Sequence, residues 1–351
     1  MQIVMVSGHA CIRVQKISLP LIQDGHKVHL IARKVPSLVE NYASFHLYRD
    51  VEQLINTIKL FEHADIFHCH NEPSWFVAAI KEIFPNKPVI LDVHDTYLTR
   101  ISPEEHDRRL EHGEYPIRIT AEERLNIQLA DGLVHVSEKV RDVVDREFAP
   151  NVPSVILPSY LPRMFYCYDL KEWLGGLVYE GKVTLPEEVK SKVGATGFEY
   201  CDYMELARQA KEIKLDFHLY PARNDKEFLA QFDELAYCHP PVSFNTLIKV
   251  ISRHDWGLVG NAFYTQQWDH ALPNKLFDYM AACVPAVAMN ASVCSEFLKE
   301  HGVGIAVDSV KELASRWAEH RECREQLVKK RQQFCMEENN QCLKDLYGGM
   351  V

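Results

Sequence analysis

The sequence predicts an α/β protein with two doubly wound, Rossmann-like domains that face each other across a cleft. Short apolar runs alternate with amphipathic helical stretches along nearly the whole chain, a pattern typical of parallel sheets covered by helices. The alternation stops at residues 160–175, where aromatic residues and a proline gather ahead of the pair Gly175 and Gly176, and then restarts. A chain of 351 residues is long for one core and sufficient for two.

The first half of the chain supplies one of these domains, at residues 1–160. Strands are expected at 2–8, 26–33, 65–71, 87–95, 133–137 and 154–159, and helices at 12–25, 51–64, 74–84, 122–132 and 138–148. Gly25 follows the first helix, where glycine takes the left-handed conformation at little cost. The irregular stretch at 161–175 is interpreted as a linker.

The second domain is expected at residues 176–333. Its strands are expected at 177–183, 215–222, 256–260, 285–289 and 304–307, and its helices at 203–213, 225–235, 243–254, 274–283 and 293–302. The segment 334–351 carries a final helix with few partners nearby in the sequence. One interpretation is that this helix crosses back to the first domain.

Composition and charge narrow the class of protein. The net charge of -10 argues against a nucleic acid as the main partner, because phosphate backbones favour basic surfaces. The ten cysteines include no C-x-x-C pair, so we expect reduced thiols in a cytoplasmic protein. The N-terminal stretch is interpreted as a strand rather than a signal peptide, and no window resembles a membrane span. Any membrane contact is therefore expected to be peripheral.

Open α/β sheets bind ligands beyond the carboxyl ends of their strands, so the loops there carry the candidate residues. Asn274 and Lys275 begin a helix after Pro273, and the free amides and dipole of a helix start attract an anion. Asp278 lies four residues after Asn274 on the same helix face, where a carboxylate can accept hydrogen bonds from the two hydroxyls of a ribose. The alternative is that Asp278 only complements the helix dipole and that Lys275 is solvated.

Further candidates follow other strands. Gly181 and Lys182 end a strand, where a lysine can neutralise a phosphate, although a solvated lysine is the alternative. His94 can hydrogen-bond a ligand hydroxyl or transfer a proton, or it can be a histidine satisfied by its core neighbours. Gly8 lies in the first strand–helix loop, where a small residue lets a ligand approach the backbone. Arg13 opens the next helix and faces either the cleft or the surface.

A metal site is not expected. His68 and His70 lie on one strand face, but no third ligand is evident nearby in the sequence. We therefore expect one of them to pack and the other to line the rim of the cleft. No D-x-D pair is present to hold magnesium against a diphosphate. A P-loop, a G-x-G-x-x-G fingerprint and a G-x-S-x-G elbow are also missing, which disfavours NTPases, dinucleotide-binding enzymes and hydrolases.

Several motifs resemble a known family when they are taken in order along the chain. The stretch "PNKLFDYMAACVPAVA" is similar to the signature "PNKLFEYMAAGKPVIA". Weaker similarities to the same family are carried by "GHKVHLIA", "ADIFHCHN", "VILDVHD", "ADGLVHVSE" and "LVYEGKV". On these segments, which span nearly the whole chain, the sequence resembles the retaining, nucleotide-sugar-dependent glycosyltransferases of family GT4, which have the GT-B fold.

The resemblance implies roles for individual residues. Asp278 takes the place of the glutamate that binds the donor ribose, and Lys182 that of the residue that neutralises the donor diphosphate. His94 takes the place of the histidine that contacts the transferred sugar. His270 occupies the position of the family's other glutamate, and Cys283 that of a glycine. The donor is implied to be a UDP-, GDP- or other nucleotide sugar, with no separate cofactor and no metal.

The combined prediction is a cytoplasmic glycosyltransferase that moves a sugar from a nucleotide diphosphate sugar to a glycan or lipid-linked saccharide. Retention of configuration is implied by the family alone. The loop region at 94–120, in the first domain, is the candidate for acceptor contacts. One alternative is a sugar-nucleotide epimerase or inverting transferase of the same fold, and another is a degenerate protein that binds a nucleotide or partner without turnover. The acidic charge counts against a third, a DNA-base glucosyltransferase.

Overall fold

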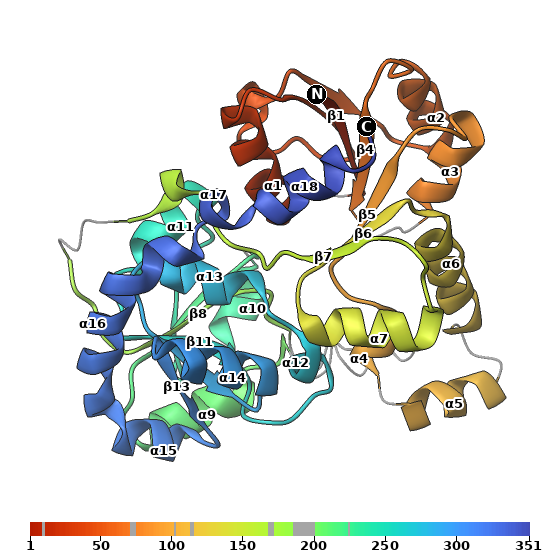
Figure 1. Ribbon diagram of the computed structural model, residues 1–351. Coiled ribbons are helices and arrows are strands. Elements are labelled where there is room, and N and C mark those ends of the chain that lie inside the picture. Colours follow the sequence, from red (N-terminus) through yellow and green to blue (C-terminus); the bar gives the residue numbers. More distant parts are fainter. Residues whose placement is uncertain are drawn as a thin grey trace. The chain divides into compact units, whose positions relative to one another are not determined.

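The computed structural model describes residues 1–8, 11–70, 75–101, 103–112, 116–167, 172–184, 201–223 and 225–351. Contacts divide the chain into two compact units (Figure 1). Unit 1 comprises Met1–Pro162 together with Met336–Val351, and unit 2 comprises Arg163–Cys335. Each unit contains one sheet, and the two sheets have seven and six strands.

The sheet of unit 1 is parallel throughout, with the strand order β3-β2-β1-β4-β5-β6-β7. Its strands are β1 (Gln2–Ser7), β2 (Lys27–Ala32), β3 (Ser44–Leu47), β4 (Ile66–His70), β5 (Val89–Val93), β6 (Gly132–His135) and β7 (Ser154–Ile156). The sequence did not indicate β3, a short edge strand whose residues are only partly buried and so lack an apolar run.

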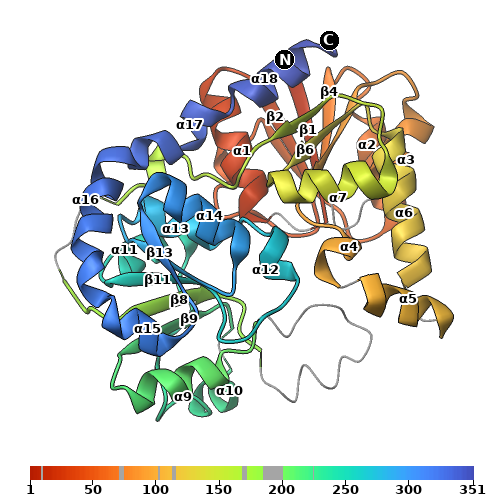
Figure 2. The ribbon, with the colours of Figure 1, turned by 60° about the horizontal axis from the view of Figure 1, so that its bottom comes forward.

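Helices cover both faces of this sheet (Figure 2). One face carries α2 (Val51–Lys59), α3 (Phe76–Ile83), α6 (Pro116–Leu129) and α7 (Glu138–Phe148). The other carries α1 (Ile12–Gln23), α17 (Met336–Asn339) and α18 (Gln341–Gly348). The final helix of the chain is thus two short helices, and both belong to unit 1. Gly25, at φ 86°, follows α1 in the left-handed conformation.

Successive side chains of a strand point to opposite faces of the sheet, so residue parity assigns each side chain to one of these faces. In β1, Ile3 and Met5 pack under α1 and α18, whereas Val4 and Val6 pack under α2 and α3. In β5, Ile90 lies on the α1 and α18 face. The same parity places the polar side chains of β4 and β5 on this face, and this arrangement determines the site in unit 1.

The region at 94–120 is mostly helical, which corrects the expectation of a long loop. Its described parts form α4 (Tyr97–Arg100), α5 (Pro103–Glu111) and the start of α6. Thr99 supports the start of α4, because its hydroxyl accepts a hydrogen bond of 3.1 Å from the Thr96 amide. Proline at the first position of α5 also favours a helix start. Residues 102 and 113–115 lie outside the described part of the chain.

The sheet of unit 2 is also parallel, with the order β10-β9-β8-β11-β12-β13. Its strands are β8 (Leu177–Gly181), β9 (Phe217–Pro221), β10 (Tyr237–Cys238), β11 (Trp256–Gly260), β12 (Ala286–Met289) and β13 (Gly304–Val307). Its helices are α9 (Met204–Glu212), α10 (Lys226–Ala230), α11 (Phe244–Ile251), α12 (Gln267–His270), α13 (Asn274–Ala281), α14 (Ser292–His301), α15 (Val310–Ser315) and α16 (His320–Lys330), with short 3-10 turns at Arg163–Phe165, Trp317–Glu319 and Arg331–Phe334. The sequence did not indicate β10 and α12, which have two and four residues.

In each sheet, the order in which successive strands are added changes direction at one point. This switch point lies between β1 and β4 in unit 1 and between β8 and β11 in unit 2. Ligands of open parallel sheets bind at such switch points, beyond the carboxyl ends of the strands. Of the interpreted linker at 161–175, residues 168–171 lie outside the described part, and the two units divide after Pro162.

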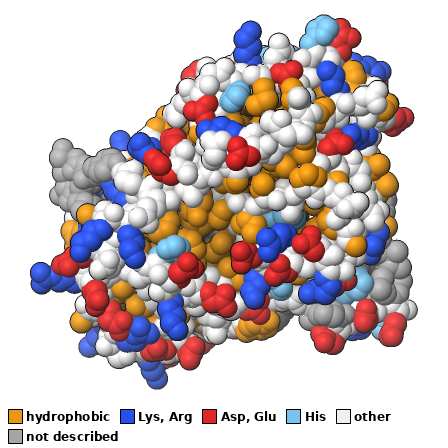
Figure 3. Space-filling model, in the orientation of Figure 1, with side chains coloured by type: hydrophobic (Ala, Val, Ile, Leu, Met, Phe, Trp, Pro, Cys, Tyr) orange, Lys and Arg blue, Asp and Glu red, His pale blue; other side chains and the backbone are white. Residues whose placement is uncertain are grey.

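The surface carries charges of both signs. Figure 3 shows lysines and arginines interspersed with aspartates and glutamates, without one large basic area on the face that it displays. Among the described helices, none is long and apolar enough to cross a membrane.

Candidate functional site

The first candidate group lies in unit 2, where β8 ends beside the start of α13. A Cβ atom added to Gly181 would lie 3.9 Å from Cε of Lys275, so the two residues are close neighbours. Gly181 has φ 118°, a conformation that side chains rarely permit. The structure therefore brings together Gly181 and Lys275, two residues that lie far apart in the sequence.

Tyr179 connects both lysines of this group. Its ring is buried in β8, and the ammonium nitrogen of Lys275 lies 5.1 Å from the ring centroid. Its hydroxyl donates a hydrogen bond of 2.9 Å to the backbone oxygen of Lys182. Trp268 of α12 contacts the same ammonium, at 5.5 Å from its ring centroid. Cation–π contacts of this kind hold a lysine in place without neutralising its charge.

The start of α13 differs slightly from the expectation. Pro273 is the N-cap, with extended backbone at φ -74° and ψ 157°, and Asn274 is the first helical residue. Asn274 and Lys275 are half-buried. Asp278 follows one turn later and is only 2% exposed. Of the candidate residues on α13, Asp278 is therefore the least accessible to a ligand.

The position of α13 is fixed by a close approach to β11. Tyr279 donates hydrogen bonds to the backbone oxygens of Leu258 at 3.1 Å and Val178 at 3.3 Å, so it bridges two strands. A Cβ on Gly257 would lie 2.3 Å from the Tyr279 ring, so only glycine permits this contact. The helix that carries Lys275 is thereby anchored to the strands on both sides of the switch point.

His270 and Asp269 end α12, the short helix before α13. His270 Nδ1 donates to the backbone oxygen of Gln266 at 3.2 Å. Both carboxylate oxygens of Asp269 are used, because they accept hydrogen bonds from Tyr264 at 2.6 Å and from Ser292 at 2.8 Å. Asp269 is therefore committed to a structural role, whereas His270 is kept as a ligand candidate.

The second candidate group lies in unit 1 and is centred on Asp92 of β5. Asp92 is fully buried and accepts two hydrogen bonds from Nε of Arg13, at 2.9 and 3.1 Å, and one from Nη2 at 2.9 Å. Arg13 also donates to the Ser159 hydroxyl at 3.0 Å. Arg13 is 1% exposed, so its surface placement, one of the two alternatives from the sequence, is wrong.

Three histidines surround the same carboxylate. The ring nitrogens nearest to Asp92 Oδ2 are Nδ1 of His70 at 3.2 Å, Nε2 of His94 at 3.6 Å and Nε2 of His68 at 4.0 Å. His68 and His70 are fully buried, whereas the His94 side chain is 25% exposed. Neither His68 nor His70 lines a rim, which corrects that expectation, and His94 is the accessible member.

The protonation states follow from burial and from the arginine. Burial lowers the pKa of His68 and His70, so both are neutral near pH 7. Burial alone would raise the pKa of Asp92, but Arg13, followed by the neighbouring histidines, outweighs it and holds the pKa well below its usual range. The group is therefore an Arg–Asp ion pair with the neutral imidazoles of His68 and His70 beside it.

His68, His70 and Asp92 form the group of potential metal ligands that was not evident in the sequence. Two features make the geometry of this group unsuitable for binding a metal ion. Arg13 already occupies both oxygens of Asp92. The rings of His68 and His70 are stacked with an interplanar angle of only 9°, so their in-plane lone pairs do not converge on one point. This group is better suited to positioning His94 than to binding a cation.

Sequence signals existed for the residues that were missed. Asp92 interrupts the apolar run of β5, and a carboxylate inside a buried strand requires a partner. Arg13 and Lys16 interrupt the apolar face of α1. Tyr347, whose hydroxyl lies 2.6 Å from His68 Nδ1, gave no signal because it is separated by 279 positions. Gly8 is buried directly after β1, and residues 9 and 10 of its loop lie outside the described part.

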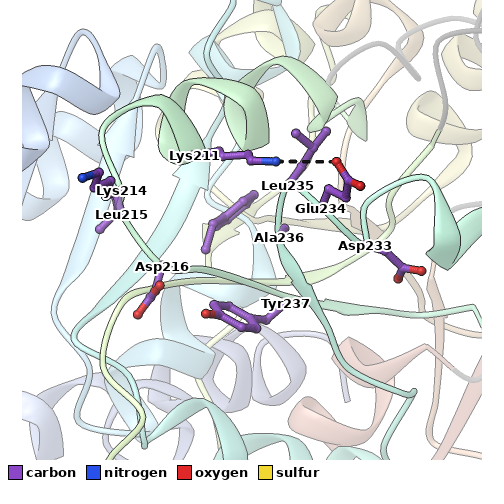
Figure 4. A pocket seen from close by; sticks show the side chains of 10 residues that line it. Lys211, Lys214, Leu215, Asp216, Asp233, Glu234, Leu235, Ala236 and Tyr237 are labelled. Carbon is purple, nitrogen blue, oxygen red and sulfur yellow. Dashed lines mark ion pairs between the residues drawn. The ribbon is translucent and has the colours of Figure 1, made fainter.

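A hollow of about 280 Å³ lies at the opposite, N-terminal edge of β9 and β10 (Figure 4). Its charged residues are of both signs, and Lys211 pairs with Glu234 at 3.8 Å. The remaining charged lining residues are Lys214, Asp216 and Asp233. Mixed charges do not favour an anionic ligand, so this hollow is not the candidate site.

Comparisons with known proteins agree with the fold and with the motifs. Residues 13–159 match the family described as Glycosyltransferase Family 4. No curated protein matches the sequence. Sucrose-phosphate synthase from Thermosynechococcus elongatus is similar in structure, with a TM-score of 0.69 and 12% identity over 100% of this chain and 99% of that one.

Two further solved structures have the same fold. HepE from Anabaena, in complex with UDP-glucose, has a TM-score of 0.67 and 13% identity over 99% of this chain and 100% of that one. WaaG, a glycosyltransferase involved in lipopolysaccharide biosynthesis, has a TM-score of 0.63 and 10% identity over 99% and 98%.

Two parallel Rossmann-like sheets, each with polar residues at its switch point, define the GT-B fold. The match over residues 13–159 shows that this part of the chain is similar to Glycosyltransferase Family 4. The resemblance inferred from the sequence is confirmed.

Proposed function

We propose that the chain transfers a hexosyl group from a nucleoside diphosphate sugar to a glycan or a lipid-linked saccharide, with retention of the anomeric configuration. The bond between the anomeric carbon and the diphosphate oxygen breaks, and its electron pair leaves with the nucleoside diphosphate. The acceptor hydroxyl forms the new glycosidic bond and loses its proton. Negative charge builds on the diphosphate as the bond breaks, so cations fixed at that position accelerate the step.

The observation that supports this proposal is the proximity of Lys275 to Gly181 at the switch point of the second sheet. Lys275 is held by two aromatic rings at the positive end of α13, where an anion is favoured. Lys182 follows Gly181 in the same loop. We assign the diphosphate to these two lysines, with Gly181 allowing its close approach to the backbone.

The remaining donor contacts are proposed for Asn274, Asp278 and His270. Asp278 would bind the ribose hydroxyls, which requires them to reach a carboxylate that is now buried. His270 would contact the sugar in place of the family's glutamate. In unit 1, His94 would contact the transferred sugar. Gly8, which has no side chain, would let the sugar approach the backbone closely. No metal is assigned to the donor site.

The choice of donor and acceptor for a first test rests on the relatives. HepE was solved with UDP-glucose, so UDP-glucose is the first donor to test. WaaG is involved in lipopolysaccharide biosynthesis, which makes a lipid-linked saccharide the first acceptor class. We propose that residues 94–120, now seen as α4, α5 and the start of α6, contact this acceptor. None of the ten cysteines forms a disulfide bond, and we propose a cytoplasmic location with at most peripheral contact to a membrane.

The experiment begins with a thermal-shift panel of nucleotides and nucleotide sugars, because a ligand stabilises the folded state by mass action. The best donor is then used to measure transfer or slow hydrolysis in Lys275→Gln. Removing a cation that stabilises the leaving group should lower kcat/KM by roughly 100-fold or more. Lys211→Gln is the matched control, because Lys211 is an exposed lysine of the same unit at the opposite sheet edge.

The outcomes separate the alternatives. A nucleotide sugar that binds without releasing any nucleotide would favour a degenerate binding protein. Conversion of one nucleotide sugar into another would indicate an epimerase. The proton NMR spectrum of the product distinguishes retention from inversion through the coupling constant of the anomeric proton. Equal loss of activity in the Lys275 and Lys211 variants would contradict the assignment of the diphosphate site.

A further inference from the structure

The C-terminal helix α18 contacts the histidine group of unit 1 through one side chain. Tyr347 is fully buried, and its hydroxyl lies 2.6 Å from Nδ1 of His68. Both residues lie on the face of the sheet that α1 and α18 cover. A short hydrogen bond between elements 279 residues apart is a specific contact and fixes the orientation of the His68 ring.

The direction of this hydrogen bond follows from the chemistry of its partners. Burial raises the pKa of Tyr347 well above its usual range, so the phenol keeps its proton. Burial lowers the pKa of His68, so the imidazole is neutral. The Asp92 carboxylate, whose Oδ2 lies 4.0 Å from Nε2, favours the single imidazole proton on Nε2, so the phenol donates to Nδ1. Tyr347 thus stabilises this tautomer of His68.

The contacts continue from His68 to His94. The rings of His68 and His70 are stacked, with centroids 4.7 Å apart. His70 Nδ1 lies 3.2 Å from Asp92 Oδ2 and 3.4 Å from His94 Nε2. Nε2 is therefore the nitrogen of His94 that faces the buried group. On the other side of Asp92, the Arg13 side chain prevents the carboxylate from moving to compensate.

We infer that Tyr347 is a positioning residue for His94, and that it acts through His68, His70 and Asp92. The inference rests on the proposed role of His94 in contacting the transferred sugar. The C-terminal helix thereby contributes to the reaction without touching the substrate. Positioning errors of this kind lower kcat more than they change substrate binding, because the donor still binds but the reacting groups are misplaced.

The test uses Tyr347→Phe, which removes one oxygen atom and keeps the packing of the ring. We expect kcat to fall roughly tenfold while the donor KM stays within about twofold. The second measurement does not depend on activity: the ¹⁵N chemical shifts of the imidazoles report the tautomers. His68 and His94 should both change in the variant, although His94 is not in contact with Tyr347.

Tyr42→Phe is the matched control. The Tyr42 hydroxyl is also buried in the cluster under α1, but it lies beside Ser18 rather than beside the histidine group. It should leave kcat and the His94 resonances unchanged. No substitution at position 42 is expected to alter kcat.

Three outcomes decide the matter. A change at His94 together with a lower kcat supports the inference. Unchanged His94 resonances in Tyr347→Phe overturn it, whatever the activity. If the resonances change but both Tyr347→Phe and His94→Gln retain full kcat, the proposed role of His94 is wrong, and the catalytic part of this inference fails with it, while the donor site tested through Lys275 is unaffected.

Discussion

The ammonium group of Lys275 lies 5.1 Å above the ring of Tyr179, and these two residues come from the facing ends of α13 and β8. Tyr179 also holds the backbone of Lys182 through its hydroxyl. A single buried tyrosine therefore positions two lysines, one through its π face and the other through its polar end.

Tyr179→Phe separates these two contributions. The variant keeps the ring beneath Lys275 but loses the hydrogen bond to Lys182. Since one such bond contributes about 0.5–1.5 kcal/mol, the dissociation constant of the donor should rise by roughly two- to tenfold. Isothermal titration with the nucleoside diphosphate measures it. An unchanged constant would show that the backbone of Lys182 does not need this anchor to bind the diphosphate.

Cys283 ends the signature helix in a left-handed conformation, at φ 59°. A side chain in that conformation is strained by about 1 kcal/mol, whereas glycine is not. Cys283→Gly should therefore raise the free energy of unfolding of unit 2 by about 0.5–1 kcal/mol. Cys283→Ala, which keeps the Cβ atom, is the control and should give no gain. A lower melting temperature in the glycine variant would contradict the claim that Cys283 is strained.

The buried Arg13–Asp92 pair makes a prediction about stability. Asp92→Leu leaves a buried guanidinium without its carboxylate and should cost about 3–5 kcal/mol in urea unfolding. The double variant Arg13→Met, Asp92→Leu removes both charges and should recover most of this loss. If the double variant is no more stable than Asp92→Leu, the arginine is not the source of the penalty. Both variants should lose activity, because each disrupts the support of His94.

Histidines of unit 2 predict a loss of stability in mild acid. Burial, aided by the neighbouring imidazoles, lowers the pKa of His218 to about 3, and burial lowers that of His254 to about 4. The unfolded chain protonates both near pH 6.5, so below this pH the unfolded state binds more protons. The free energy of unfolding should then fall as the pH decreases from 6.5 toward 4, by up to about 1.4 kcal/mol per pH unit for each histidine.

Urea unfolding at several pH values tests this prediction with His218→Gln. The slope of stability against pH between 6.5 and 4 should decrease by about one proton in the variant. An identical slope in both proteins would mean that His218 is protonated in the folded state.

Removal of residues 336–351 should destabilise unit 1. The segment buries Met336, Leu343, Leu346 and Tyr347 on the sheet. Each such side chain contributes about 1.5–3 kcal/mol, so the loss should be roughly 6 kcal/mol or more, comparable to the whole stability of a domain. Limited proteolysis should then cleave unit 1 while unit 2 stays resistant. Protection of unit 1 in the shortened chain would contradict the packing.

The sequence predicted the layers well, because apolar periodicity reports burial and both sheets are buried on their two faces. Strand β11 and helix α7 have the predicted bounds. Elements without a clear apolar period were missed, such as β3, β10 and α12. The segment at 94–120 was interpreted as a loop region, although it contains α5, a helix of mostly charged residues.

The sequence predicted the site residues that lie within single loops, but not the contacts between loops. The signature around Lys275 and the strand end at Gly181 were both identified, but their proximity depends on the strand order, which periodicity does not give. The group around Asp92 was not foreseen as a group, since Arg13, Ser159 and Tyr347 come from three distant parts of the chain. Such long-range pairs leave only a weak trace in one sequence, namely a polar residue where an apolar one is expected.

The return of Met336–Val351 to unit 1 has a consequence for biosynthesis. A ribosome completes all of unit 2 before it makes the segment that covers the α18 face of the first sheet. Until then, that face and the ring of His68 lack their cover, and unit 2 can fold first although its sequence is made second. The nascent protein therefore exposes a half-covered apolar sheet throughout the synthesis of unit 2, and this interval is when chaperones would bind it.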